Sequence, residues 1–238
     1  MKPVTLVIPC KDEARRLNPA AFRQAVEEIP GVSFLFVDDG STDATASMLA
    51  HLAGSCPAID TLYLRKNIGK AESVRAGIRH LLAGGGGGLV GFWDADLATP
   101  LEEVRRFVQA FERDGCTELV VGSRWPHLGA RIDRSVFRSC TGAFMKFLIR
   151  RVLTVPVYDT QCGAKVMTRT LAARLFARPF VSRWLFDVEL FRRMGRRDVL
   201  RGVRELPLDD WRDVDGSKMT FRAAVLSVFD LFRIACAA

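Results

Sequence analysis

The sequence is poor in histidine and has no paired cysteines. Its three histidines and six cysteines include no Cys-x-x-Cys pair and no histidine at metal-ligand spacing from a cysteine. Neither a structural zinc site nor a disulfide framework is therefore indicated. Scattered cysteines of this kind fit a protein kept in a reducing cytosol.

Long apolar segments are also missing. No uninterrupted apolar run approaches the roughly 20 residues that a helix needs to cross a bilayer. The first apolar run, residues 4–8, stops at Pro9 and has neither the length nor the cleavage site of a signal peptide. We therefore expect a cytoplasmic protein whose contact with a membrane is peripheral.

The composition fits one catalytic domain, residues 1–238, with anionic partners. Of the 238 residues 49% are hydrophobic, which is enough for a substantial core. Lys and Arg number 35 against 27 Asp and Glu, and this excess favours nucleotide phosphates, nucleic acid or acidic lipid headgroups. Nucleic acid is disfavoured because the sequence has no stacking platform and no helix-turn-helix pattern.

Short apolar runs alternate with helical segments through the first half of the chain. Asn18 and Pro19 are typical of a helix start, and Asp43 is expected to cap the next helix. Such alternation predicts an α/β fold with a Rossmann-like, mostly parallel sheet flanked by helices. The predicted strands are residues 4–8, 34–37, 62–64, 89–93 and 118–121, and the predicted helices are residues 19–29, 43–53, 71–82 and 100–113.

Two more helical segments are predicted in the second half. Residues 134–153 interleave apolar and basic side chains, which fits either a helix in a membrane interface or a core helix with a solvated basic face. Residues 221–235 have a helical period and few charges, so they form either a packing helix or a second interfacial helix.

A pair of acidic residues follows the fourth predicted strand. Ligands of open α/β sheets lie at the carboxyl ends of the strands. Asp94 and Asp96 are one residue apart there, and two such carboxylates repel each other unless a cation lies between them. Hard oxygen ligands of this kind suit Mg²⁺ or Mn²⁺ holding a diphosphate. Alternatively, one or both carboxylates only cap the helix that starts near Pro100.

Asp38 and Asp39 form a second acidic cluster at the end of the second predicted strand. Asp39 is suited to accept hydrogen bonds from a base or ribose, and Gly40 lets the backbone approach a ligand. A plain turn after the strand is the alternative.

Basic residues lie between and after these acids in the sequence. Lys70, Arg124 and Arg131 would offset negative charge that develops on a departing diphosphate. A role as ordinary surface cations is the alternative.

Taken in order, these segments resemble the inverting family 2 glycosyltransferases, which have the GT-A fold. Four motifs in register over about 100 residues make the resemblance specific. They are Val7-Ile8-Pro9-Cys10-Lys11-Asp12-Glu13, Val37-Asp38-Asp39-Gly40-Ser41-Thr42-Asp43-Ala44-Thr45, Asn67-Ile68-Gly69-Lys70 and Asp94-Ala95-Asp96.

The second half is similar to the dolichyl-phosphate glucosyltransferases and their mannosyltransferase relatives. Ala98 is a departure, since the mannosyltransferase relatives often have glutamine there, and it favours the glucosyl type. The matching segments are Gly122-Ser123-Arg124, Asp159-Thr160-Gln161-Cys162-Gly163-Ala164-Lys165, Phe186-Asp187-Val188-Glu189-Leu190, Glu205-Leu206-Pro207, Trp211 and Gly216-Ser217-Lys218.

The resemblance, together with the charges noted above, implies a role for each candidate site residue. Arginine and lysine would grip the phosphates of donor and acceptor, and acidic residues of the second half would line or organise the sugar pocket. The implied sets are Asp96, Arg124, Arg131, Asp187 and Lys218 for catalysis; Pro9, Glu13, Asp38, Asp39, Lys70 and Asp94 for the nucleotide sugar; Asp94 and Asp96 for Mg²⁺ or Mn²⁺; and Asp159, Gln161, Asp187 and Glu189 for the sugar pocket.

By this resemblance the chain is expected to transfer a hexose, with inversion, from a UDP-glucose- or GDP-mannose-type donor to a polyprenyl or dolichyl phosphate at the cytoplasmic face of a membrane. Residues 1–125 would bind the donor and residues 126–238 the acceptor. A lipid phosphate is already anionic near neutral pH and needs no strong base. A glycan or small-molecule hydroxyl would need one, for which Asp187 or Asp159 is the candidate. The third possibility is a nucleotide-sugar-binding protein without turnover.

Overall fold

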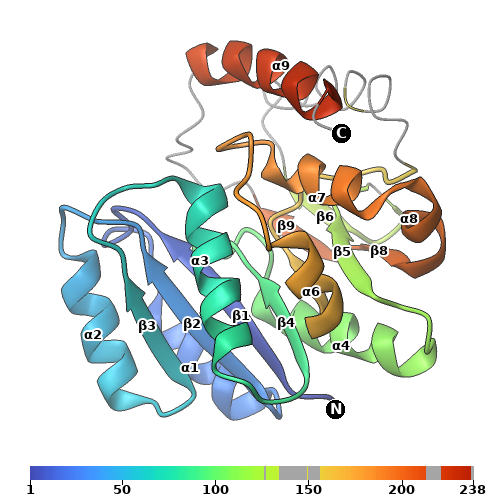
Figure 1. Cartoon of the computed structure of the whole chain (residues 1–238). Helices are drawn as coiled ribbons and strands as arrows, with labels where there is room; N and C mark the ends of the chain where they lie inside the picture. The colour runs from blue at the N-terminus through green and yellow to red at the C-terminus, as the bar shows by residue number, and fades with distance from the viewer. Residues whose placement is uncertain (126, 134–148, 150–155, 213–220, 237–238) are drawn as a thin grey trace.

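The computed structural model describes residues 1–125, 127–133, 149, 156–212 and 221–236 (Figure 1). A seven-stranded sheet in the order β3-β2-β1-β4-β7-β5-β8 forms its centre. The strands of this sheet are β1 (Val4–Cys10), β2 (Val32–Asp38), β3 (Ile59–Tyr63), β4 (Leu89–Phe92), β5 (Leu119–Ser123), β7 (Lys165–Thr168) and β8 (Val203–Pro207). A parallel pair, β6 (Arg131–Asp133) and β9 (Asp210–Arg212), forms a second sheet.

Strand β7 runs antiparallel to both of its neighbours, β4 and β5, whereas the other neighbouring strands of the large sheet are parallel. The carboxyl ends of β1, β2, β4 and β5 therefore meet at one edge, and β7 begins at that same edge. The predicted mostly parallel α/β sheet is confirmed. Sequence analysis did not predict β7, because four residues that begin with a lysine carry too little apolar pattern.

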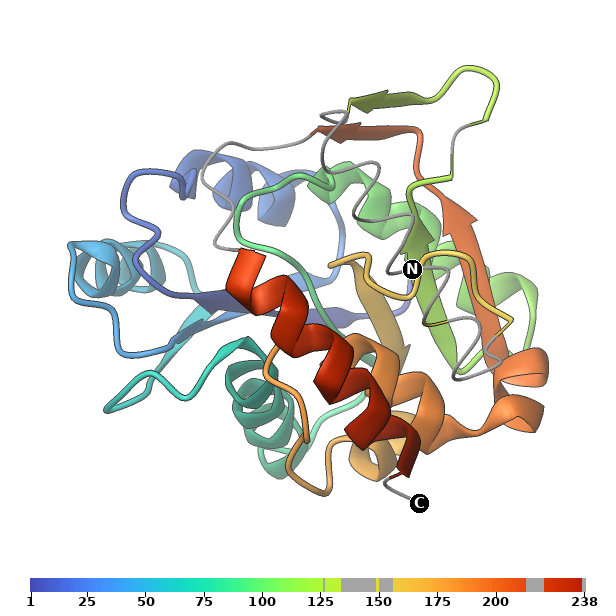
Figure 2. The same cartoon turned by 90° about the horizontal axis from the view of Figure 1, so that it is seen from above.

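Helices cover both faces of the large sheet (Figure 1). They are α1 (Pro19–Glu28), α2 (Thr45–Ser55), α3 (Lys70–Ala83), α4 (Val104–Arg113), α6 (Arg169–Leu175), α7 (Phe186–Met194), α8 (Arg196–Gly202) and α9 (Phe221–Cys236), with a 3₁₀ turn, Leu101–Glu103, before α4. Seen from above, α9 crosses over the carboxyl edge of the strands (Figure 2).

Two apolar cores result from the alternation of side chains along each strand. Leu6 and Ile8 of β1 pack in the core that includes α1, α2 and α4, where Phe22 meets Phe34 edge-on at 5.1 Å between ring centroids. Val7 points to the opposite core, with α3, α6 and α7. Burial of β1 on both faces explains why its sequence reads as a continuous apolar run.

A third, smaller cluster joins α9 to α7. Leu185 and Val188 of the α7 region pack against Leu231 and Ile234 of α9. The predicted C-terminal helix therefore has a packed face. In the described part of the chain no helix combines the length and the apolar character that crossing a membrane requires.

The other predicted elements agree with the structure to within a few residues. Asn18 accepts a hydrogen bond from the Ala21 backbone, and Pro19 is the first helical residue, as predicted. The predicted cap at Asp43 is wrong in detail, because Ala44 is the N-cap residue of α2 while Asp43 accepts from the Thr45 backbone next to it. The helix predicted over 134–153 lies outside the described residues, apart from Ile149.

Candidate active site

The edge where the parallel strands end gathers acids from separate motifs. Asp38 ends β2, Asp94 and Asp96 follow β4, and Arg124 follows β5. The segment that ends in Gly163 and Ala164 reaches the same edge, because β7 runs in the opposite direction. Residues as far apart in sequence as Asp38 and Gly163 are thus brought to one edge by the sheet topology rather than by any local pattern.

Asp39 holds the loop that precedes α3. Its carboxylate is 3% exposed and accepts hydrogen bonds from the backbone nitrogens of Ile68 at 2.6 Å and Gly69 at 2.8 Å. Asp38, beside it, accepts from the Ser41 backbone at 3.1 Å. These two of the predicted nucleoside-binding residues thus lie at the site edge, and Asp39 also holds the loop, a role that sequence analysis did not predict.

The first acidic turn, between β1 and α1, is fixed by contacts to the segment after β2. Glu13 is buried, pairs with Arg16 at 2.6 Å, and its backbone nitrogen donates to the Thr45 hydroxyl at 2.8 Å. Asp12 has a φ of 50° and accepts from the Thr42 backbone. Hydrogen bonds from Lys11 and from that backbone lower the pKa of Asp12 to about 2. Charge–dipole contacts therefore hold the turn together across two motifs.

Asp94 occupies a tight place between a lysine and a glycine. Lys70, the first residue of α3, lies 2.5 Å from Asp94 Oδ1. On the other side, a Cβ atom at Gly163 would lie 1.9 Å from Asp94 Oδ2. Only glycine leaves room for this carboxylate, which explains the presence of Gly163 at the start of the β7 segment.

Asp96 is the second member of the predicted metal pair. Burial and the neighbouring Asp94 carboxylate raise the pKa of Asp96, which accepts one hydrogen bond from the Ala98 backbone at 3.1 Å. The alternative interpretation, a helix cap, is wrong, because the turn at Leu101–Glu103 follows Pro100 without a side-chain cap.

The carboxylates of Asp94 and Asp96 fit a divalent cation that keeps some of its coordination positions for other ligands. Within the described ranges, no group of three or more His, Cys, Asp and Glu side chains is arranged to hold a metal ion. Burial and the Asp94 charge raise the pKa of Asp96, and the Lys70 ammonium already lies against Asp94, so the pair has the negative potential that attracts a cation. A hard ion bound by two carboxylates takes its remaining ligands from phosphate oxygens and water.

A buried ion pair joins β7 to α7 near Asp94. Lys165 is fully buried and lies 2.5 Å from Asp187 in the first turn of α7. Its ammonium also donates to the Cys162 carbonyl at 2.6 Å and faces the Phe92 ring at 5.2 Å. Burial raises the pKa of Asp187, and the charges of Lys165 and Lys70 oppose that shift. Sequence analysis gave Lys165 no role, because nothing in the residues around it indicates that a lysine there is buried.

Arg124 is held by a second network at the end of β5. Its guanidinium forms two hydrogen bonds to the fully buried Asp159, at 2.6 and 2.8 Å, and lies over the Trp211 ring at 5.3 Å. Asp159 and Tyr158 in turn donate their backbone nitrogens to Glu205. The predicted phosphate-binding arginine is therefore oriented by Asp159, which sequence analysis assigned to the sugar pocket.

The remaining predicted site residues have different surroundings. Arg131 lies in β6, outside the large sheet, with an exposed side chain. Glu189 accepts from the Val181 backbone and from Arg193, so it holds the start of α7. Pro9 lies within β1 opposite Val37. Lys218 lies outside the described residues.

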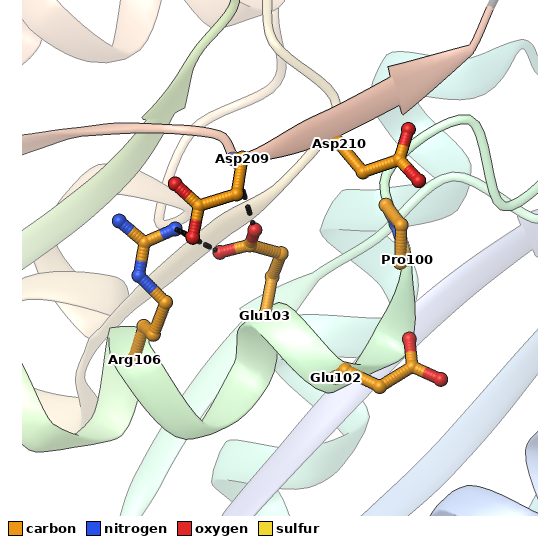
Figure 3. Close-up of a pocket in the computed structure, with 6 residues that line it drawn as sticks. All are labelled: Pro100, Glu102, Glu103, Arg106, Asp209 and Asp210. Atoms are coloured by element: carbon orange, nitrogen blue, oxygen red, sulfur yellow. Dashed lines mark hydrogen bonds and ion pairs between the residues drawn. The ribbon is translucent and has the colours of Figure 1, made fainter. Parts of the chain in front are cut away.

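A separate cavity of about 330 Å³ lies beside the first turn of α4 (Figure 3). Glu103 is held there by Arg106 at 2.8 Å and by the Asp209 backbone at 3.2 Å. Burial raises the pKa of Glu103. None of the strand-end acids described above lines this cavity.

Comparison with known proteins fits this arrangement. The family model described as glycosyl transferase family 2 matches residues 5–176. The chain belongs to this family. It is therefore a glycosyltransferase, as the resemblance of its motifs implied. The matched range contains the predicted metal pair and the loop around Lys70.

Several curated family 2 enzymes are similar over most of the chain. A dolichyl-phosphate beta-glucosyltransferase of Trichomonas vaginalis is 32% identical over 243 residues, covering 97% of this chain and 70% of the relative. The enzyme of that name from Drosophila melanogaster is 32% identical, covering 91% and 69%, and the one from Homo sapiens is 28% identical, covering 92% and 70%.

Solved structures support the GT-A fold of this family 2 chain. Glucosyl-3-phosphoglycerate synthase from Mycobacterium tuberculosis in complex with UDP matches with a TM-score of 0.70 and 16% identity, covering 98% of this chain and 80% of that one. The same synthase with Mn²⁺, UDP and glucosyl-3-phosphoglycerate matches with a TM-score of 0.70 and 18% identity, covering 99% and 80%. The predicted fold class is confirmed.

Proposed function

We propose that this family 2 glycosyltransferase transfers a hexose from a nucleotide sugar, with inversion, to a polyprenyl or dolichyl phosphate at a membrane surface. The observation that carries the proposal is the convergence of Asp94, Asp96 and Lys70 at the carboxyl edge of the sheet. The names of the similar curated enzymes support a glucosyl group and a dolichyl phosphate acceptor. UDP-glucose is the donor to test first, with GDP-mannose as the second.

On the donor side, Asp94 and Asp96 hold Mg²⁺ or Mn²⁺, and the ion supplies positive charge to the leaving diphosphate. Lys70 adds a second positive charge at the same place. Pro9, Glu13, Asp38 and Asp39 hold the nucleoside, directly or through the loops that they fix. Structures of the similar synthase contain Mn²⁺ or Mg²⁺ with UDP, which supports the choice of ion for this fold.

On the acceptor side, the state of the buried carboxylates favours a phosphate over a hydroxyl. Asp187 is paired with Lys165, and Asp159 is paired with Arg124. Each carboxylate is already engaged by a cation, so taking a proton from a hydroxyl acceptor would break its ion pair. A lipid phosphate needs no such base, so these ion pairs do not hinder sugar transfer to it. Arg124, Arg131 and Lys218 are the proposed partners of the donor and acceptor phosphates.

Exposed aromatic side chains on α9 support peripheral attachment, at the cytoplasmic face, to the membrane that holds such a lipid. Phe229 is 65% exposed and Phe232 is 56% exposed, while Leu231 and Ile234 of the same helix are buried. An amphipathic helix with one packed face and one aromatic face is suited to lie in a headgroup layer.

Transfer of radiolabelled sugar tests this function. UDP-[¹⁴C]glucose and GDP-[¹⁴C]mannose are each incubated with the chain, Mn²⁺ and dolichyl phosphate in detergent. Label in an organic-extractable, acid-labile product supports the proposal. Label that appears only on a water-soluble glycan or small-molecule acceptor supports the hydroxyl alternative. Donor binding without hydrolysis or transfer would indicate a binding protein.

A thermal-shift screen identifies the donor independently of the acceptor. A ligand that binds only the native state raises its apparent stability, by about 2.7 kcal/mol at 100 times its Kd. We expect UDP-glucose with Mn²⁺ to raise Tm more than GDP-mannose does. The reverse order would replace the glucosyl assignment with a mannosyl one.

A further inference from the structure

Two adjacent residues between α6 and α7 connect α9 with the loop before α3. Ser182 donates its hydroxyl hydrogen bond to Asp230 of α9, at 2.7 Å. Arg183, the next residue, donates from its guanidinium to Asn67 at 2.9 Å. Asn67 belongs to the loop before α3, and the carboxylate of Asp39 holds that loop from the other side.

The contact with Arg183 is shaped by a glycine in the loop. Gly69 has a φ of 92°, a conformation that favours glycine, and a Cβ there would lie 2.6 Å from Arg183 Nε. The loop backbone therefore lies directly against the guanidinium, between Arg183 and Asp39. A side chain at position 69 would both strain the loop and displace the arginine.

Lys70 follows this loop without an intervening residue and reaches Asp94. The position of its ammonium thus depends on how firmly residues 67–69 are held. At its other end, Ser182 is itself fixed, because it is 1% exposed and its hydroxyl oxygen accepts from the backbone of Leu185 at 2.9 Å. A continuous set of short contacts runs from α9 to the acid pair.

We propose that Ser182 and Arg183 link α9 to the donor loop, residues 67–70, so that α9 sets how tightly the site binds a nucleotide diphosphate. Arg183 is a positioning residue in this link, and it acts through Asn67 and Gly69. The inference rests on the proposed function for the identity of the ligand. The mechanical link itself rests on the contacts alone.

Loss of the guanidinium tests the first half of the link. In Arg183→Met, the backbone amides of Ile68 and Gly69 should exchange with solvent faster, and Kd for UDP with Mn²⁺ should rise, each by about two- to tenfold, the range for one lost hydrogen bond. Arg178→Met is the matched control, an exposed arginine of the same connection, and should change neither. Unchanged amide exchange in Arg183→Met, at unchanged Tm, overturns the link.

A second variant separates positioning from direct contact with the nucleotide. Asn67→Ala removes the hydrogen-bond partner and leaves the arginine charge in place, so it should reproduce the faster exchange and the weaker UDP binding of Arg183→Met. Normal UDP binding in Asn67→Ala, with weak binding in Arg183→Met, would mean that Arg183 touches the nucleotide itself. That result overturns the positioning role.

The connection to α9 is tested at its far end. Asp230→Ala removes the acceptor of the Ser182 hydroxyl and should speed exchange at Ile68 and Gly69. Arg233→Ala removes a different partner of Asp230, at 3.2 Å, and should leave that exchange unchanged. Equal exchange in Asp230→Ala and the wild type overturns the link to α9. If the wild type binds no UDP, the proposed function fails, while the exchange data still decide the link.

Discussion

The ammonium group of Lys70 lies 2.5 Å from Asp94, one of the two carboxylates proposed to hold a metal ion. Burial lowers the pKa of Lys70, but Asp94 and Asp187 outweigh burial and raise it. The lysine therefore stays charged and neutralises part of the acid pair. A divalent cation that binds Asp94 has to compete with it.

Lys70→Met is expected to bind Mn²⁺ more tightly than the wild type when no nucleotide is present. Removing a unit charge near 4 Å is worth a few kcal/mol at a protein surface, so the affinity should rise by about tenfold or more. Electron paramagnetic resonance of free Mn²⁺ measures this directly. Lys66→Met, an exposed lysine just before the loop, is the control, and equal affinities in both variants would contradict the competition.

Asp96→Asn is expected to lose transfer activity by at least about a thousandfold, because a metal site stabilises several kcal/mol of developing charge. The amide keeps an oxygen that can accept from the Ala98 backbone, so the fold and Tm should be preserved. Chelation of the metal in the wild type should give a similar loss. Asp60→Asn, at an exposed position of β3, is the control. Normal transfer by Asp96→Asn in buffer with excess Mn²⁺ would refute the metal assignment.

Gly163→Ala should displace the Asp94 carboxylate, since the added Cβ would lie 1.9 Å from Oδ2. Overpacking of this kind costs about 1–3 kcal/mol, which corresponds to a loss of Mn²⁺ affinity of about 5- to 150-fold if the metal site carries the strain. Gly115→Ala adds the same methyl group where nothing lies within 4 Å and serves as the control. Titration calorimetry with Mn²⁺ and UDP compares them, and equal affinities would show that Asp94 is not confined there.

Lys165→Met should destabilise the protein by about 3–5 kcal/mol, because it leaves the buried Asp187 without its partner. The double variant Lys165→Met/Asp187→Leu removes both charges and should recover most of that loss. Urea unfolding measures both. Transfer activity should stay low in the double variant, since Asp187 is proposed to organise the sugar pocket. A single variant as stable as the wild type would show that the pair is not needed for the fold.

The stability of the protein relative to Glu103→Gln should fall as the pH rises above about 4.5. Burial raises the pKa of Glu103 from that ordinary value, so the folded protein holds the proton more tightly than the unfolded chain. The stabilisation is therefore complete below 4.5 and is lost as the pH rises through the folded-state pKa. Urea unfolding of both proteins between pH 4 and 8 tests this, with exposed Glu102→Gln as control. A stability difference that rises with pH would contradict the shift.

Much of the first half of the fold was predictable from local pattern. Strands β1 and β2 are apolar runs that end at a proline or at acids, and α1 begins at Asn18 and Pro19 with the side-chain contact expected there. The motif residues Asp94 and Asp96 were identified because two carboxylates one residue apart at a strand end repel each other unless a cation lies between them, and because they follow the other family motifs in register. Strand β7 and the buried state of Lys165 were not predictable, because four residues with a lysine at one end look like a solvated segment.

The sequence by itself determined the family, the order of strands and helices up to residue 121, and the acids that follow those strands, since these depend on residue type and spacing along one segment. Only the tertiary structure decided which of those acids are already paired. Lys70 with Asp94, Lys165 with Asp187 and Arg124 with Asp159 join segments 22 to 35 residues apart. An ion pair forms where the sheet brings two charges within reach, and that distance is fixed by packing rather than by either residue's neighbours in the chain.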